Sequence, residues 1–99
     1  DQAIDDQQWQ QAVVLLERAL RINGKQAETW TRLSMVHLGQ YNPQQSIHMA
    51  KRSNSYARNN TSLQAYNWLL ISRAYTLMQR HEQASEAEMK SQQLQQASH

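Results

Sequence analysis

Four histidines and two adjacent carboxylates, Asp5 and Asp6, are the side chains whose types could support acid–base or metal chemistry. No two histidines have the HExxH spacing that places two imidazoles and a base on one helix face. The chain has no cysteine, which excludes thiolate metal sites and thiol catalysis. Adjacent carboxylates diverge on a helix, so this pair favours helix capping. We therefore predict a protein that is not an enzyme, with no catalytic residue, metal site or cofactor.

The three tryptophans and His37 have the spacing of core residues rather than that of a ligand-binding set. His37 lies on the helical stripe of Trp30 and Leu33, which favours packing over metal binding. Met35 is expected to lie off this stripe. Neither a glycine-rich phosphate loop nor a GxSxG nucleophile elbow is present in the sequence. These residues therefore indicate binding or packing, not catalysis.

Composition and charge narrow the class of protein further. The net charge is +2 without a basic cluster, so we expect no nucleic-acid binding. The longest apolar runs, 12–16 and 68–71, are too short to cross a membrane, so this segment is not expected to insert into one. Glycine and proline are nearly absent, which favours an all-α chain. Because the chain begins at Asp1 without Met, we expect a processed chain or part of a longer one.

Turn signals divide the chain into five expected helices. Gly24 is expected to close the first helix in the left-handed conformation, and Asn42 with Pro43 to begin the third. Thr61 and Gln64 have the spacing of a capping box. Short connections make successive helices antiparallel neighbours. The expected helices are residues 6–23, 26–38, 43–58, 62–79 and 82–96.

The expected helices contain an internal repeat. Three small or apolar residues of the first segment recur 34 residues later, with Ala12, Leu16 and Ala19 corresponding to Ser46, Ala50 and Ser53. Trp30 recurs 38 residues later as Trp68, and the four extra residues are placed at Asn59 and Asn60. A fixed period of this size indicates a stack of helical hairpins.

These residues resemble the tetratricopeptide repeat family, in which the first helix of each hairpin carries Trp, Leu-Gly and Tyr. The second helix of the family carries small residues around a large one. The matching residues are Trp30, Leu33, Ser34, His37, Ser46, Ala50 and Ser53, then Trp68, Ile71, Ser72, Tyr75 and Ala84. The departures are serine for glycine twice, His37 for the aromatic, Glu88 at a usually apolar position and no closing proline. A generic helical array is the alternative.

The resemblance implies an all-α fold in which antiparallel hairpins stack as a tetratricopeptide-like right-handed solenoid of about five helices. Residues 1–99 form a single domain, divided into the second helix of a truncated repeat (1–24) and two repeats (26–60 and 61–97). Small residues at Ser34, Ser46, Ser72 and Ala84 are expected to let the two helices of a hairpin approach closely. Runs 17–22 and 64–71 also resemble repeat-containing lipoproteins of the bacterial envelope, which favours a periplasmic or outer-membrane-associated location over a cytoplasmic one.

The family resemblance implies a scaffold that binds a peptide or protein segment in the concave groove of the array. The implied groove residues are Glu28, Thr31, Arg32, Met35, Tyr66, Leu69, Arg73 and Thr76, with Leu70 beside them. Arg32 and Arg73 could hold a carboxylate, or be solvated surface charges. Thr31, Met35 and Leu70 stand where chaperone-binding members carry Lys and Asn, so no chaperone clamp is expected.

A structural or self-assembly module is the alternative function. The hairpin partner of the first helix is missing from the expected array, which leaves apolar side chains of that helix under-covered. These are Trp9, Val13, Leu15, Leu16 and Ile22. Exposed apolar surface of this kind drives association, so a homodimer through the uncovered first helix is the second hypothesis.

Overall fold

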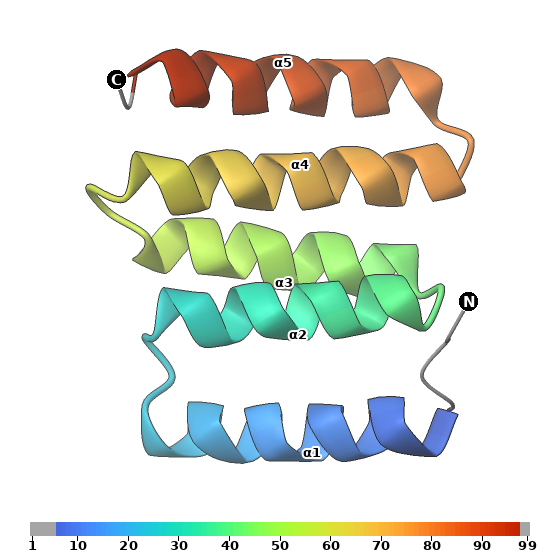
Figure 1. Ribbon diagram of the computed structural model, residues 1–99, viewed down its shortest axis with the longest axis vertical. Helices are drawn as coiled ribbons and strands as arrows, with labels where there is room; N and C mark the ends of the chain where they lie inside the picture. Colours follow the sequence, from blue (N-terminus) through green and yellow to red (C-terminus); the bar gives the residue numbers. More distant parts are fainter. Residues whose placement is uncertain (1–5, 98–99) are drawn as a thin grey trace.

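The computed structural model describes residues 6–97, which fold into five α-helices without a strand (Figure 1). The helices are α1 (Asp6–Ile22), α2 (Ala27–Gly39), α3 (Pro43–Tyr56), α4 (Thr61–Leu77) and α5 (His81–Ala97). The predicted all-α class and the five helices are confirmed, and every predicted helix end lies within two residues of the observed one. Asp5 and His99 lie outside the described residues.

Each helix packs against the next one in the chain, and α2 also contacts α4. Figure 1 shows α1 at one end of the molecule and α5 at the other, with α2, α3 and α4 between them. Among the described helices, α1 contacts α2 alone. The molecule therefore has a central group of helices and two ends with different surroundings.

The hydrophobic core lies where α3, α4 and α5 meet. Its buried residues are Ile47, Ala50, Ile71, Ala74 and Ala87, and Leu38, Trp68, Tyr75 and Met78 pack against them. Burial of a side chain as large as Ile71 contributes about 1.5–3 kcal/mol. Residues of α1 do not belong to this cluster, so the central helices are stabilised without α1.

Hairpin α2–α3 and hairpin α4–α5 are built alike, at a constant offset of 38 residues. Tyr41 and Gln79, in their connecting turns, both have a φ of 61°. Arg52 lies 5.1 Å from the ring centroid of Trp30. Its counterpart Lys90 lies 4.4 Å from that of Trp68. The backbone turn and the cation–aromatic contact are therefore both repeated.

Small residues lie at the close approach of both hairpins, as the sequence predicts. The Ser34 hydroxyl donates to the Ser46 carbonyl oxygen at 2.7 Å. The Ser72 hydroxyl donates in the same way to the Ala84 carbonyl oxygen at 2.9 Å. Both serine hydroxyls thus bond to the backbone of the facing helix, and this satisfies polar groups that would otherwise be buried without partners.

Two details of the predicted turns are wrong, and a third is confirmed in position only. Gly24 does not have a positive φ; the left-handed positions are Tyr41, Asn59 and Gln79. Asn60, not Thr61, is the N-cap of α4, and its side-chain oxygen accepts from the Leu63 amide at 3.1 Å. Asn42 stands at the N-cap position of α3 and Pro43 in its first turn, but the Asn42 side chain makes no capping bond.

The four extra residues of the longer period are also placed differently from the prediction. The connection before α4 is as long as the connection before α2, since each spans the four residues between two helices. Helix α4 has 17 residues, whereas α2 has 13. The insertion is therefore about one turn of helix in α4 rather than a longer loop.

No helix in the described part of the chain is both long and apolar enough to span a membrane.

Candidate functional site

A largely apolar cleft of about 520 Å³ lies between α1 and α2. We call it the α1–α2 cleft. It is lined by Trp9, Ala12, Leu15 and Leu16 of α1 and by Arg32, Met35 and Val36 of α2. Apolar side chains gathered in an open cleft with one charged group at its edge are typical of a binding site.

Trp9 and Gly39 close one end of the α1–α2 cleft. The Trp9 ring lies directly against Gly39, in the space that a β-carbon at this position would occupy. A larger side chain at this position would overlap the indole unless the Trp9 ring moved. The last residue of α2 thus fixes how closely the first turns of α1 can approach it.

The outer surface of α1 continues the apolar character of the cleft. Leu15, which is 61% exposed, lines both the cleft and a second hollow formed with Val14 and three glutamines. Ile22, at the end of the helix, is 83% exposed. Large apolar side chains grouped at this exposure indicate a surface that contacts another molecule.

The two arginines of the predicted groove have different settings. Arg32 lines the α1–α2 cleft, whereas Arg73 lies on the exposed side of α4, outside it. Neither guanidinium forms an ion pair or hydrogen bond within residues 6–97. An unpaired guanidinium at an apolar cleft can hold a carboxylate through two hydrogen bonds.

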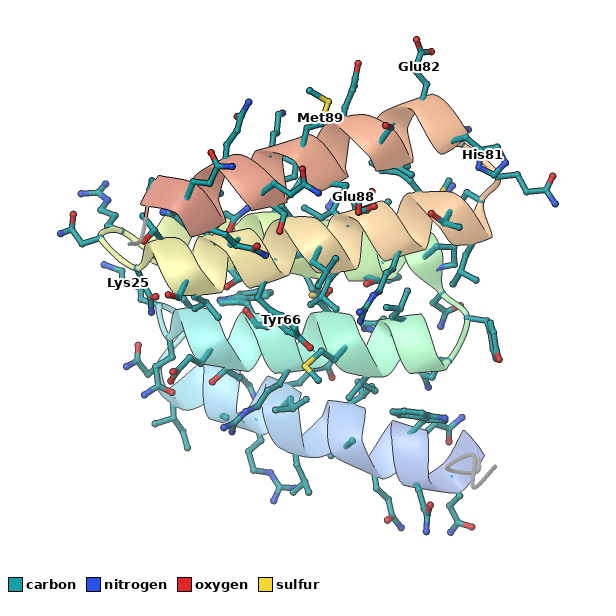
Figure 2. The ribbon with its side chains drawn as sticks, turned by 45° about the horizontal axis from the view of Figure 1, so that its top comes forward. Lys25, Tyr66, His81, Glu82, Glu88 and Met89 are labelled. Carbon is teal, nitrogen blue, oxygen red and sulfur yellow. The ribbon has the colours of Figure 1, made fainter. Side chains whose placement is uncertain are left out.

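Of the other predicted groove residues, only Met35 lines the α1–α2 cleft. Glu28 and Met35 are exposed on the same helix as Arg32, and Met35 lines the cleft. Tyr66 extends from α4 toward α2 in Figure 2, outside the α1–α2 cleft. Leu69, which is half-buried, and Thr76, whose hydroxyl donates to the Ser72 carbonyl oxygen at 3.0 Å, are also outside it.

Thr31 was expected in the groove, and this prediction is wrong. It is 4% exposed, and its hydroxyl donates to the Asn67 side-chain oxygen at 2.6 Å. Its oxygen also lies 2.8 Å from the Ser53 hydroxyl. Leu70 is buried as well. Thr31 therefore faces α4, which α2 contacts.

A buried polar network joins α2, α3 and α4, and sequence reasoning did not find it. The Asn67 amide nitrogen donates to the Ser53 hydroxyl and to the Asn54 side-chain oxygen, both at 2.8 Å. Together with Thr31 these groups satisfy one another. The available signal was a polar residue, Asn67, inside the most apolar helix. Such a network fixes the relative position of helices, since a shifted helix would leave buried groups unpaired.

His37 lies in the last turn of α2. Its Nδ1 atom is buried without a hydrogen-bond partner in the described residues. Burial lowers the pKa of His37 below its usual 6.5, while the Glu17 charge and a side-chain hydrogen bond with Gln40 oppose the shift. The side chain is half-buried, in keeping with the predicted packing role.

The remaining described histidines and the tryptophans do not form a metal site or a ligand-binding set. His48 and His81 are exposed, and within residues 6–97 no group of three His, Asp or Glu side chains could hold a metal ion. The Trp30 ring stacks on Tyr56 with centroids 6.5 Å apart, and its Nε1 donates to the Gly24 carbonyl oxygen at 2.8 Å. Trp68 packs on the core.

Comparisons of the chain with protein-family models, with curated proteins and with solved structures give no match.

Proposed function

We propose that this chain is a protein-interaction module that acts by binding rather than by catalysis, and that the α1–α2 cleft is its main contact surface. The occupant we propose is a segment of a partner protein with apolar side chains and at least one carboxylate. The observation that carries this proposal is the apolar cleft with the unpaired Arg32 at its edge.

The chemistry of the α1–α2 cleft supports this occupant. Met35 is 42% exposed and flexible, and such a side chain adapts to different apolar partners. Leu15 adds exposed apolar surface on the facing helix. A carboxylate opposite Arg32 would add specificity, because an acidic group is attracted there and a basic one repelled.

We also propose that the helices stack as a tetratricopeptide-type right-handed solenoid. The 38-residue repetition of the turn, of the serine contact and of the cation–aromatic contact supports this proposal. The contact between α2 and α4, the first helices of the two hairpins, supports it further.

Selection from a random peptide library tests the proposed function. We expect selected peptides to contain apolar residues and an acid, and to bind Met35→Asp and Arg32→Glu variants at least tenfold more weakly. Met89→Asp and Arg80→Glu are matched controls, because both residues are exposed and lie outside the cleft. A selection that yields no binder, or binders equally weakened by the controls, contradicts the proposal.

A homodimer through α1 is the second candidate, favoured by the exposure of Val14 and Ile22 on its outer surface. Sedimentation across a wide concentration range tests it directly. A dimer that Val14→Asp converts to a monomer supports self-assembly, whereas a strict monomer excludes it.

A further inference from the structure

We infer that the occupant of the α1–α2 cleft is an α-helix of a partner protein, which packs there as α2 packs against α3 and α4. The inference rests on the proposed function, since it specifies the partner of the same cleft. It is drawn from the internal repeat, because the same surface occurs twice in the molecule and is filled by a helix in one of its two copies.

Helix α1 corresponds to helix α3, 34 residues further along the chain. Both helices are followed by four-residue connections and then by a helix that packs back on them. The pair α1–α2 is therefore built like the pair α3–α4. In the pair α3–α4, α2 lies against both helices.

Two positions of α3 show what α2 covers. Ser46 and Ala50 are 0% exposed, and the Ser46 hydroxyl lies 2.9 Å from that of Ser34 on α2. Their counterparts on α1 are Ala12 and Leu16, which line the open α1–α2 cleft and are only half-buried. The cleft is thus the surface that a helix covers in the other copy.

The correspondence between α1 and α3 indicates which side chains the occupant should carry. The close contact between Ser34 and Ser46 requires a small residue on the incoming helix, and Ala12 provides the small residue on α1. In α2 the large residues Trp30 and Leu33 precede the small residue Ser34 by four positions and by one, so we expect the same spacing in the partner helix. A carboxylate on the edge of that helix would reach Arg32.

A helix also fits this cleft better than an extended strand does. An extended segment leaves half of its backbone groups without partners unless it pairs with a strand, and the described residues contain none. A helix satisfies its own backbone and presents apolar side chains on one face. The partner we infer is therefore an amphipathic helix with a narrow small-residue contact.

The sequence of α2 itself supplies the probe. A capped, fluorescent peptide of residues 26–42 carries the face that fills the corresponding surface of α3 and α4. Short peptides are weakly helical in water, so a lactam is added between a glutamate introduced by Arg32→Glu and a lysine introduced by Val36→Lys. These positions lie on the side of α2 that faces α1, and the lactam leaves the Glu28 carboxylate of the peptide free. Binding is followed by anisotropy and by circular dichroism.

We expect saturable binding with a gain of peptide helicity. Leu15→Asp in the protein should weaken binding at least tenfold without unfolding the chain, because Leu15 is mostly exposed. Met89→Asp is the matched control: Met89 is 55% exposed on α5, at the other end of the molecule, and this variant should bind within twofold of wild type. Leu33→Asp in the peptide should also weaken binding at least tenfold.

Three results would overturn the inference. They are absence of saturable binding, equal losses for Leu15→Asp and Met89→Asp, and binding without a gain of helicity. Library peptides that occupy the cleft without helical structure, together with failure of the α2 peptide, would leave the proposed function standing and remove the helical partner. Failure of both experiments would remove both.

Discussion

The two ends of the molecule differ in what they present to solvent. At the α5 end, Ser85 and Glu88 are exposed, although Ile47 and Ala50, their counterparts in α3, are buried in the core. Glu82 and Met89 project away from the body of the molecule in Figure 2. At the α1 end, by contrast, Leu15 and its apolar neighbours form an open cleft. A polar outer face is typical of a terminal helix that needs no further partner, so we place the proposed binding surface on α1.

The attachment of the two terminal helices differs as well. Two serine hydroxyls bond across the α4–α5 interface, Ser72 to the Ala84 carbonyl oxygen and Ser91 to the Ala65 carbonyl oxygen at 2.7 Å. Helix α1 lies against a single helix, with the Trp9–Gly39 contact at one end. The two terminal helices thus differ: α5 is part of the closed core, whereas α1 forms one wall of the open cleft.

The largest effect is expected from truncating the core of the closed end. Ile71→Ala should lower the free energy of unfolding by roughly 2–5 kcal/mol, because it leaves a cavity in a fully buried cluster. Leu16→Ala in the cleft should cost about 1 kcal/mol, since this side chain is only half-buried. Urea denaturation measures both. Equal losses would mean that α1 is packed as tightly as α4.

The second-largest loss of stability is expected from breaking the buried polar network. Asn67→Ala removes the partner of Thr31, Ser53 and Asn54, and the unsatisfied groups should cost about 2–3 kcal/mol. Asn54→Ala, at the edge of the network, is the control and should cost about 1 kcal/mol. The unfolding midpoint of each variant gives the difference. A neutral Asn67→Ala would show that the network does not stabilise the central helices.

A smaller loss is expected where α1 meets the end of α2. Gly39→Ala should destabilise the protein by about 1–3 kcal/mol, because the new methyl group overlaps the Trp9 ring. In a Trp9→Ala background the same change should cost much less. A double-mutant cycle measured by denaturation quantifies this coupling, and strictly additive losses would exclude the contact.

Acid should weaken the α1–α2 interface through His37. The lowered pKa means that the folded state binds this proton more weakly than the unfolded state does. Stability from this group is therefore present above pH 6.5 and declines as the pH falls below that value toward the folded-state pKa. The free energy of unfolding of wild type and of His37→Gln is measured by denaturation at several pH values. The difference between the two should change as the pH falls. A difference that is independent of pH contradicts it, and the exposed His48→Gln serves as control.

The smallest expected effect is a gain of stability at the turn between α4 and α5. Gln79 holds a left-handed φ of 61°, which glycine adopts without steric cost. Gln79→Gly should raise the free energy of unfolding by about 0.5–1 kcal/mol. The equivalent Tyr41→Gly should gain a similar amount. Thermal unfolding checks both, and a loss at Gln79 would mean that its side chain makes a stabilising contact.

The periodicity of the sequence predicts the five helices because the apolar spacing and the turn residues agree along the whole chain. It also predicts the serine contacts, since small residues recur at the same offset in both hairpins. The left-handed positions were missed because Tyr41 and Gln79 lack the glycine signal on which turn prediction depends. The inward position of Thr31 was missed because a polar residue carries no sign of a buried partner 36 residues away.

The α1–α2 cleft was predicted only in part. Arg32 and Met35 were assigned to a binding surface, but that surface was placed between α2 and α4. Ala12, Leu15 and Leu16 form one wall of the cleft because of the way in which α1 packs against α2. The contact between Trp9 and Gly39 is part of that packing. A contact between residues 30 positions apart leaves no periodic signal in the sequence. The cleft could therefore not be predicted without the structure.

Nuclear magnetic resonance titration with the α2 peptide tests the central claim most directly. Backbone amide shifts are followed as the peptide of residues 26–42 is added to the isotope-labelled chain. The proposed helix site predicts the largest shifts at residues 9–16 and 32–36, with little change in α5. Shifts concentrated on α5 or on the exposed side of α4 around Tyr66 and Arg73, or no shifts at saturating peptide, would contradict it.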